Sequence, residues 1–196
     1  MSEEILLIER ARNGDMISFR NLVERNEKLV YYLAYDLIGN HFDAEDISQE
    51  VFLKVYNSLK KYRGDAKFST WLYRITLNTC LTARRKKSFS AAKKQDSIDD
   101  YEDLATHSYQ SDPERLAERE IIQKNVNRAM QKLSEKEKSV FILKNHNGLS
   151  FNEISEIMSV AVGTLKSLNF RALKKMRDEL KDFREEKSGE EVKNEM

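Results

Sequence analysis

The sequence predicts an all-α protein made of two small helical domains that a flexible acidic linker joins. Only one proline and six glycines occur among 196 residues, which favours long helices with few tight turns. Apolar residues recur at helical spacing in both halves of the chain, and no segment alternates apolar and polar residues as a strand does. A stretch with little periodicity, residues 88–112, separates the two helical blocks.

The first domain is predicted to span residues 1–87. Its expected helices are residues 3–12, 15–38, 43–60 and 67–87. Apolar stripes mark the buried faces of the second and third of these helices: Phe19, Leu22, Val23, Val30, Leu33 and Leu37, then Ala44, Ile47, Val51, Val55 and Leu59. Asp43 is the expected N-cap of the third helix, and Asp46 adds negative charge to its first turn. Gly64 and Asp65 break the pattern before the fourth helix.

Residues 88–112 are predicted to be a flexible linker. Several carboxylates make this segment acidic: Asp96, Asp99, Asp100, Glu102 and Asp103. Such a composition buries too little apolar surface to offset the entropy of ordering. The second domain then spans residues 113–184 and starts a helix at Pro113, because the first helical position tolerates proline. The charged tail, residues 185–196, is expected to fray.

The second domain has the layout of a helix-turn-helix. Ser134 to Glu137 and Ser150 to Glu153 each match a capping box at the start of a helix. The second box opens a short helix with Ile154 and Ile157 facing inward. A short break at residues 159–161 precedes a long helix, which is expected over about 162–183.

The long helix presents two different faces. Leu165, Ala172, Met176, Leu180 and Phe183 cluster on one side, and the opposite side carries Lys166, Ser167, Phe170, Arg171, Lys174 and Arg177. Exposed cations, a hydroxyl and an aromatic ring are typical of a recognition helix in the major groove. Arg171 is the best candidate to bind a guanine, and Lys174 and Arg177 suit phosphates. The alternative interpretation is a surface helix with a solvated basic face.

The segment from residue 62 to residue 87 combines aromatic and basic residues. Its aromatic residues are Tyr62, Phe68, Trp71 and Tyr73, and its cations are Arg63, Lys67, Arg74 and the block Arg84–Lys87. Aromatic faces stack on unpaired bases and cations hold phosphates, so the combination suits single-stranded nucleic acid. The alternative interpretation is an amphipathic helix with an aromatic core stripe and a solvated basic end.

The composition argues against an enzyme and against a membrane protein. The histidines are scattered, and none lies at metal-ligand spacing with Cys80 or with another histidine: His41, His107 and His146. Glycine-rich phosphate loops are absent, and we expect no catalytic residue, no metal, no cofactor and no small-molecule substrate. The single cysteine, the acidic N-terminus and the lack of a long apolar run predict a cytoplasmic protein without membrane insertion.

Four segments, in this order, resemble the extracytoplasmic-function (group IV) sigma factors of the sigma-70 family. They are Leu7–Asp15, Asp43–Phe52, Phe68–Ile75 with Asn78 and Thr79 beyond it, and Ser150–Arg177 with Val162–Ser167 inside it. The resemblance implies a region 2-like bundle in residues 1–87 and a region 4-like helix-turn-helix in residues 113–184. It also implies a subunit that directs core RNA polymerase to promoters and has no catalytic site.

The resemblance assigns roles to residues of this chain. A −10 site that captures a flipped-out base would comprise Arg63, Gly64, Asp65, Ala66, Lys67, Phe68, Trp71 and Asn78. A −35 site would comprise Thr164, Lys166, Ser167, Phe170, Arg171 and Lys174. The surface for core polymerase would comprise Asp46, Gln49, Glu50 and Phe52, facing the β′ clamp helices. The β flap, promoter DNA and an anti-sigma factor are the other implied partners.

The chain departs from the family pattern at three places. Ala161 stands where relatives often have a capping serine. Leu168 and Asn169 stand where they often have arginine and an aliphatic residue, and Thr82 stands where they often have aspartate. The main rival function is a stand-alone helix-turn-helix regulator, which accounts for residues 113–184 but not for residues 62–87. A structural adaptor of two helical bundles would leave both basic faces unexplained.

Overall fold

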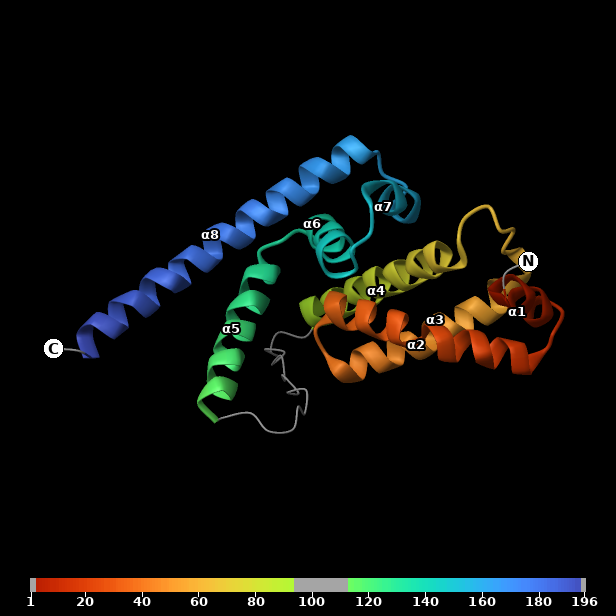
Figure 1. Ribbon diagram of the computed structural model, residues 1–196, viewed down its shortest axis with the longest axis horizontal. Coiled ribbons are helices and arrows are strands. Elements are labelled where there is room, and N and C mark those ends of the chain that lie inside the picture. The colour runs from red at the N-terminus through yellow and green to blue at the C-terminus, as the bar shows by residue number, and fades with distance from the viewer. Residues whose placement is uncertain (1–2, 94–112, 195–196) are drawn as a thin grey trace. The chain divides into compact units, whose positions relative to one another are not determined.

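A computed structural model describes residues 3–93 and 113–194, with side chains described over 3–86 and 121–181 (Figure 1). The helices are α1 (Glu3–Arg12), α2 (Met16–Ile38), α3 (His41–Ser58), the 3-10 turn η1 (Leu59–Lys61), α4 (Phe68–Lys93), α5 (Pro113–Gln131), α6 (Glu135–Phe141), the π-helical turn η2 (Ile142–His146), α7 (Phe151–Met158) and α8 (Val162–Asn194). Strands are absent from these two ranges, so the all-α prediction is confirmed. The described helices form two compact units: α1 to α4 belong to the first, and most of the chain from Pro113 onward belongs to the second.

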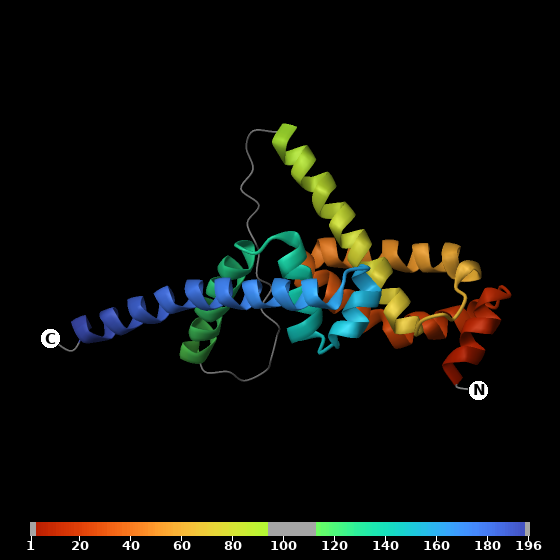
Figure 2. The same cartoon turned by 90° about the horizontal axis from the view of Figure 1, so that it is seen from above.

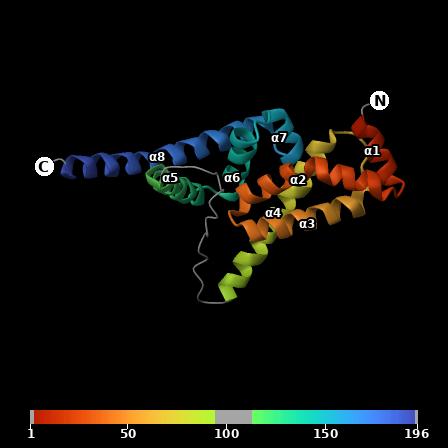
Figure 3. The same ribbon diagram turned by 60° about the horizontal axis from the view of Figure 1, so that its bottom comes forward.

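The first unit is a bundle in which α2 and α3 pack together and α4 packs on both, while α1 covers α2. Its core contains most of the predicted apolar stripes together with residues of α4, whereas Phe19 and Val23 are only half-buried. The largest fully buried side chains there are Leu22, Val30, Leu33, Leu37, Val51, Val55, Leu59 and Leu72. The last turns of α4 project beyond the bundle (Figure 2 and Figure 3). The N-terminal part of α4, which begins at Phe68, is therefore the part that packs against α2 and α3.

The turn between α2 and α3 corrects one prediction. Gly39 ends α2 with a φ of 83°, and Asn40 is already extended and caps α3. The Asn40 side chain accepts a hydrogen bond from the Asp43 amide at 3.0 Å. The prediction of Asp43 as N-cap is therefore wrong: α3 starts earlier, because glycine's freedom at positive φ lets the chain turn at once. Asp43 instead supplies the acidic residue of the first turn.

Two helix ends also differ from expectation. α4 continues to Lys93 rather than ending near residue 87, and α8 continues to Asn194, so the prediction of a frayed tail from residue 185 is wrong for residues 185–194. The added turns contain residues that favour helices, alanine and lysine in α4 and glutamate and lysine in α8. The remainder of the predicted linker, residues 94–112, lies outside the described residues.

In the second unit, α8 packs against both α5 and α6. Both predicted capping boxes are confirmed. Ser134 and Glu137 exchange side-chain and backbone hydrogen bonds at the start of α6, and Ser150 and Glu153 do the same before α7. Five of the predicted inward residues of the helix-turn-helix are buried: Ile154, Ile157, Leu165, Ala172 and Met176. Leu180 is half-buried, and the side chain of Phe183 lies outside the described residues. This packing leaves the opposite face of α8 exposed.

Candidate nucleic-acid interfaces

Three aromatic rings gather where the chain enters α4. The ring centroids of Tyr62 and Trp71 lie 5.1 Å apart, and Phe68 lies 5.7 Å from each of them. Phe68 is only 3% exposed, whereas Tyr62 and Trp71 are half-buried. Phe68 is thus the buried member of the cluster, and part of the Trp71 ring is exposed at the surface.

The loop before α4 is closed by its own hydrogen bond. The Tyr62 hydroxyl donates to the Ala66 carbonyl at 2.7 Å, and burial raises the pKa of Tyr62. Gly64 has a φ of 81°, and a Cβ at this position would meet nothing within 4 Å. The loop therefore leaves open space beside its backbone.

Most of the predicted −10 residues are exposed around this loop. Arg63, Gly64, Asp65, Lys67 and Asn78 are exposed, and Ala66 is half-buried. Asn78 lies two turns after Trp71 on α4, so the two side chains share one face of the helix. The structure thus brings the loop and the aromatic cluster together, with Asn78 farther along the same helix face.

α8 presents the predicted duplex-binding side chains on its exposed face. Every residue of the predicted −35 set is exposed: Thr164, Lys166, Ser167, Phe170, Arg171 and Lys174. Phe170 is 69% exposed although it is a large apolar residue. Lys166, Ser167, Phe170 and Arg171 border one shallow hollow on the surface. Together they place a hydroxyl, cations and an aromatic ring within the first three turns of the helix.

A buried carboxylate behind this face was not anticipated from the sequence. The Glu137 side chain is 5% exposed and pairs with Lys175 at 2.7 Å and with Arg171 at 3.7 Å. Burial alone raises the pKa of Glu137, but hydrogen bonds from Lys175 and Ser134 outweigh it and lower the pKa to about 2. Sequence reasoning identified Glu137 only as a capping residue, because its cationic partners lie on a distant helix.

The family departures have local explanations. Leu168 is 5% exposed and belongs to the core, while Asn169 accepts a hydrogen bond from Asn145 at 3.0 Å. The Ala161 carbonyl accepts from the Leu165 amide at 3.1 Å, so the first turn of α8 closes through the backbone. The Thr82 hydroxyl donates to the Asn78 carbonyl at 2.8 Å, which agrees with a local packing role.

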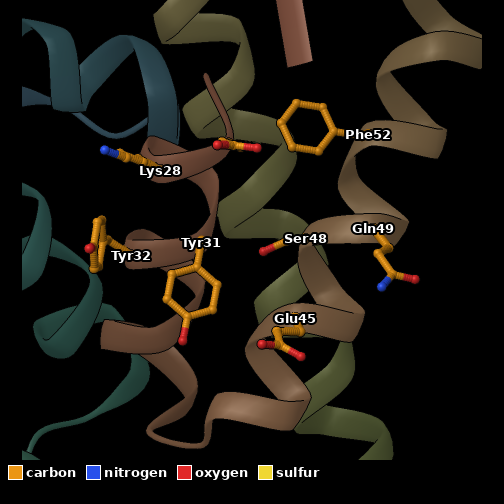
Figure 4. A pocket seen from close by; sticks show the side chains of 8 residues that line it. Lys28, Tyr31, Tyr32, Glu45, Ser48, Gln49 and Phe52 are labelled. Atoms are coloured by element: carbon orange, nitrogen blue, oxygen red, sulfur yellow. The ribbon is translucent and has the colours of Figure 1, made fainter. Parts of the chain in front are cut away.

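A groove of about 340 Å³ runs between α2 and α3 (Figure 4). It is lined by Glu27, Lys28, Tyr31, Tyr32, Glu45, Ser48, Gln49 and Phe52. Of the four predicted polymerase-binding residues, Gln49 and Phe52 line this groove. Asp46 and Glu50 are exposed on the same helix, and Glu50 pairs with Lys54 at 2.7 Å. The α2 side of the groove was missed, although Tyr31 and Tyr32 are adjacent aromatic residues on a surface helix.

Two further observations concern the expected class of protein. Cys80 is fully buried in the core, and burial raises the pKa of its thiol to about 12. Over the two described ranges, no helix combines the length and the apolar character needed to cross a bilayer.

Comparison with known proteins follows the division into two units. The Sigma-70 region 2 family model matches residues 22–90, and the Sigma-70 region 4 model matches residues 123–176. The RNA polymerase sigma-H factor of Pseudomonas aeruginosa PAO1 is 34% identical over 85% of this chain and 88% of the relative. The ECF RNA polymerase sigma-E factor of Escherichia coli K12 is 35% identical over 88% of this chain and 93% of the relative.

This chain belongs to the extracytoplasmic-function sigma factors of the sigma-70 family. Its fold is also that of the sigma factor RpoE from Bartonella quintana, solved with the anti-sigma factor NepR; the TM-score is 0.66 at 22% identity, over 83% of this chain and 96% of that one. Members of the family are RNA polymerase specificity subunits that are not themselves catalysts. The match of region 2 accounts for the aromatic and basic segment that a stand-alone regulator left unexplained.

Proposed function

We propose that this sigma factor directs core RNA polymerase to promoters by reading two DNA elements in different forms. The α8 surface binds the −35 element as duplex, and the loop before α4 captures a base of the melted −10 element. The observation that carries this proposal is the contrast between the two exposed surfaces. One combines an aromatic cluster with a loop of cations, and the other presents cations and a hydroxyl along one helix face.

At the −10 element, the loop receives a base that leaves the stack. Gly64 allows the close approach of a base, because no side chain fills the space beside its backbone. Asn78 hydrogen-bonds the base, and Arg63 and Lys67 hold neighbouring phosphates. Phe68 packs against Trp71, so the half-buried indole is held in one position for stacking. Asp65 and Ala66 complete the wall of the loop.

At the −35 element, the first turns of α8 enter the major groove. Arg171 binds the two acceptors of a guanine, and Phe170 provides an apolar contact for a thymine methyl group. Lys174 holds a phosphate, and Thr164, Lys166 and Ser167 extend the contact toward the start of the helix. The Ser167 hydroxyl donates to the Gly163 carbonyl at 3.1 Å, so its lone pairs are the part offered to DNA.

The groove between α2 and α3 is the proposed docking surface for the polymerase. A protein helix fits a groove that combines aromatic walls with charged rims, here Tyr32 and Phe52 with Glu27, Lys28 and Glu45. We assign it to the β′ clamp helices, together with Asp46, Gln49 and Glu50, and assign the β flap to the second domain. The Bartonella complex supports an anti-sigma factor as a further partner. With these partners, the protein would act in the cytoplasm, and the polymerase would perform the catalysis.

Addition of the purified chain to core polymerase on a promoter library tests this function. Sequencing of the transcripts should show new start sites that share two sequence elements. The chain alone should bind duplex DNA weakly and without preference. Tight binding to a duplex operator without polymerase, as a dimer on paired half-sites, would favour the stand-alone regulator instead.

A further inference from the structure

We infer that Glu137 is a positioning residue for sequence reading: it holds Arg171 in the orientation in which the guanidinium binds a base of the −35 element. The inference rests on the proposed function and adds a specificity-determining residue outside the recognition helix. Glu137 belongs to α6, whereas the −35 set lies on α8. It therefore acts through Arg171 and does not itself touch DNA.

The two oxygens of the Glu137 carboxylate have different partners. Oε2 accepts from the Ser134 amide at 2.9 Å and from Lys175 Nζ at 2.7 Å. Oε1 faces Arg171 Nε at 3.7 Å, which is an ion-pair distance rather than a hydrogen bond. Arg171 and Lys175 lie one turn apart on α8, so one carboxylate contacts two successive turns of the same helix.

Glu137 and Arg171 differ in burial, so Glu137 is held in place and Arg171 can change its orientation. The Glu137 side chain is 5% exposed, and the capping box fixes it at the start of α6. The Arg171 side chain is 59% exposed. A buried carboxylate requires nearby positive charge, and Lys175 at 2.7 Å supplies it directly. Arg171 is thus a second cation near the carboxylate. The carboxylate does not need Arg171 for charge balance, but it determines how the Arg171 side chain is oriented.

The geometry of the guanidinium makes this orientation useful. An ion pair through Nε leaves the edge formed by the two terminal amino groups, and this edge can donate to N7 and O6 of guanine together. Ordering a long exposed arginine costs conformational entropy, and a fixed carboxylate removes part of that cost before DNA arrives. Since Lys175 neutralises the carboxylate, the pair adds little net negative charge at the surface that meets phosphates.

The test measures base preference at the −35 element with core polymerase and a promoter library. Glu137→Gln removes the charge but keeps an oxygen that can accept from the Ser134 amide. It should reduce discrimination about fivefold at the same base position that Arg171→Ala relaxes, within the range that one bidentate contact provides. In the double variant, Glu137→Gln should add no further loss at that position. Ser134→Ala is the matched control, because it weakens the cap and keeps the carboxylate.

Several outcomes separate this inference from its alternatives. An unchanged base preference in Glu137→Gln, with activity lowered equally at all promoters, would make Glu137 structural and overturn the inference. A shift of preference in Ser134→Ala of the same size would do so too. If Glu137→Gln does not fold, Glu137→Asp keeps a charge for Lys175 while it withdraws the carboxylate from Arg171, and it should show the same shift. Wild-type protein that gives no promoter preference with core polymerase would overturn the proposed function itself.

Discussion

The Asn145 side-chain amide donates a hydrogen bond of 3.0 Å to the Asn169 side-chain oxygen, and so joins η2 to the inner edge of α8. Asn169 follows Leu168, which is 5% exposed in the core of the second unit. The pair Leu168 and Asn169 therefore works locally as an apolar core residue followed by a polar bridge. An arginine at position 168 would instead have to bury its charge.

Truncation of Leu168 should destabilise the second unit much more than truncation of Asn169. Leu168→Ala leaves a cavity and should cost about 2–5 kcal/mol. Asn169→Ala loses one exposed hydrogen bond and should cost about 1 kcal/mol. Thermal unfolding followed by circular dichroism measures both effects. Fluorescence of Trp71, the single tryptophan, reports only on the first unit and should not change in either variant.

Substitutions at Phe68 and Lys67 should have different effects: one on the stability of the first unit, the other on DNA binding at the −10 site. Phe68→Ala removes the buried member of the aromatic cluster and should cost about 3–5 kcal/mol. Lys67 is exposed, so Lys67→Ala should cost at most about 1 kcal/mol of stability and should weaken binding of single-stranded −10 DNA. Urea unfolding monitored by Trp71 fluorescence and binding of the DNA to the holoenzyme give the two readouts. A stable Phe68→Ala variant would contradict this assignment.

The helix faces could be predicted from the sequence because they depend on local spacing. The exposed set on α8 and the buried stripes of α2 and α3 follow from a period of 3.6 residues, and the capping boxes involve residues three positions apart. The N-cap of α3 was missed because Asn40 and Asp43 are both good caps, and the φ of Gly39 decides between them.

The features that the sequence did not predict join distant residues. The ion pair between Glu137 and Arg171 depends on how α6 packs on α8, and no local pattern encodes that packing. The groove between α2 and α3 likewise requires two helices to be brought together, and the sequence predicts only Gln49 and Phe52 among the residues that line it.

Asn78→Ala should impair −10 selection and leave core binding intact. Asn78 is exposed, so the change removes a hydrogen-bonding group without opening a cavity. Loss of one hydrogen bond to an extruded base should reduce promoter opening about tenfold. Permanganate footprinting of the −10 region measures opening, and native gel shift of the holoenzyme measures core binding. Loss of core binding would mean that Asn78 is a structural residue.

Phe52→Ala should weaken the complex with core polymerase and leave DNA selection unchanged in the complex that forms. The ring lines the groove between α2 and α3 and is half-buried, so its loss removes apolar contact with a docked helix (Figure 4). We expect a loss of about 1–3 kcal/mol in binding. Fluorescence anisotropy with labelled sigma factor measures the affinity. Leu53→Ala is the matched control, because Leu53 is 64% exposed on the same helix and does not line the groove.

Acid should selectively destabilise the second unit through Glu137. Its pKa is lowered from 4.5 to about 2 in the fold, so the ionised carboxylate stabilises the folded state fully above about pH 4.5. This contribution decreases as the pH falls toward 2, and its full size is about 3 kcal/mol. In the range from pH 5 to pH 2, circular dichroism should show a steeper loss of stability for wild type than for Glu137→Gln. Equal slopes for the two proteins would show that Glu137 is not the responsible group, since glutamine does not titrate.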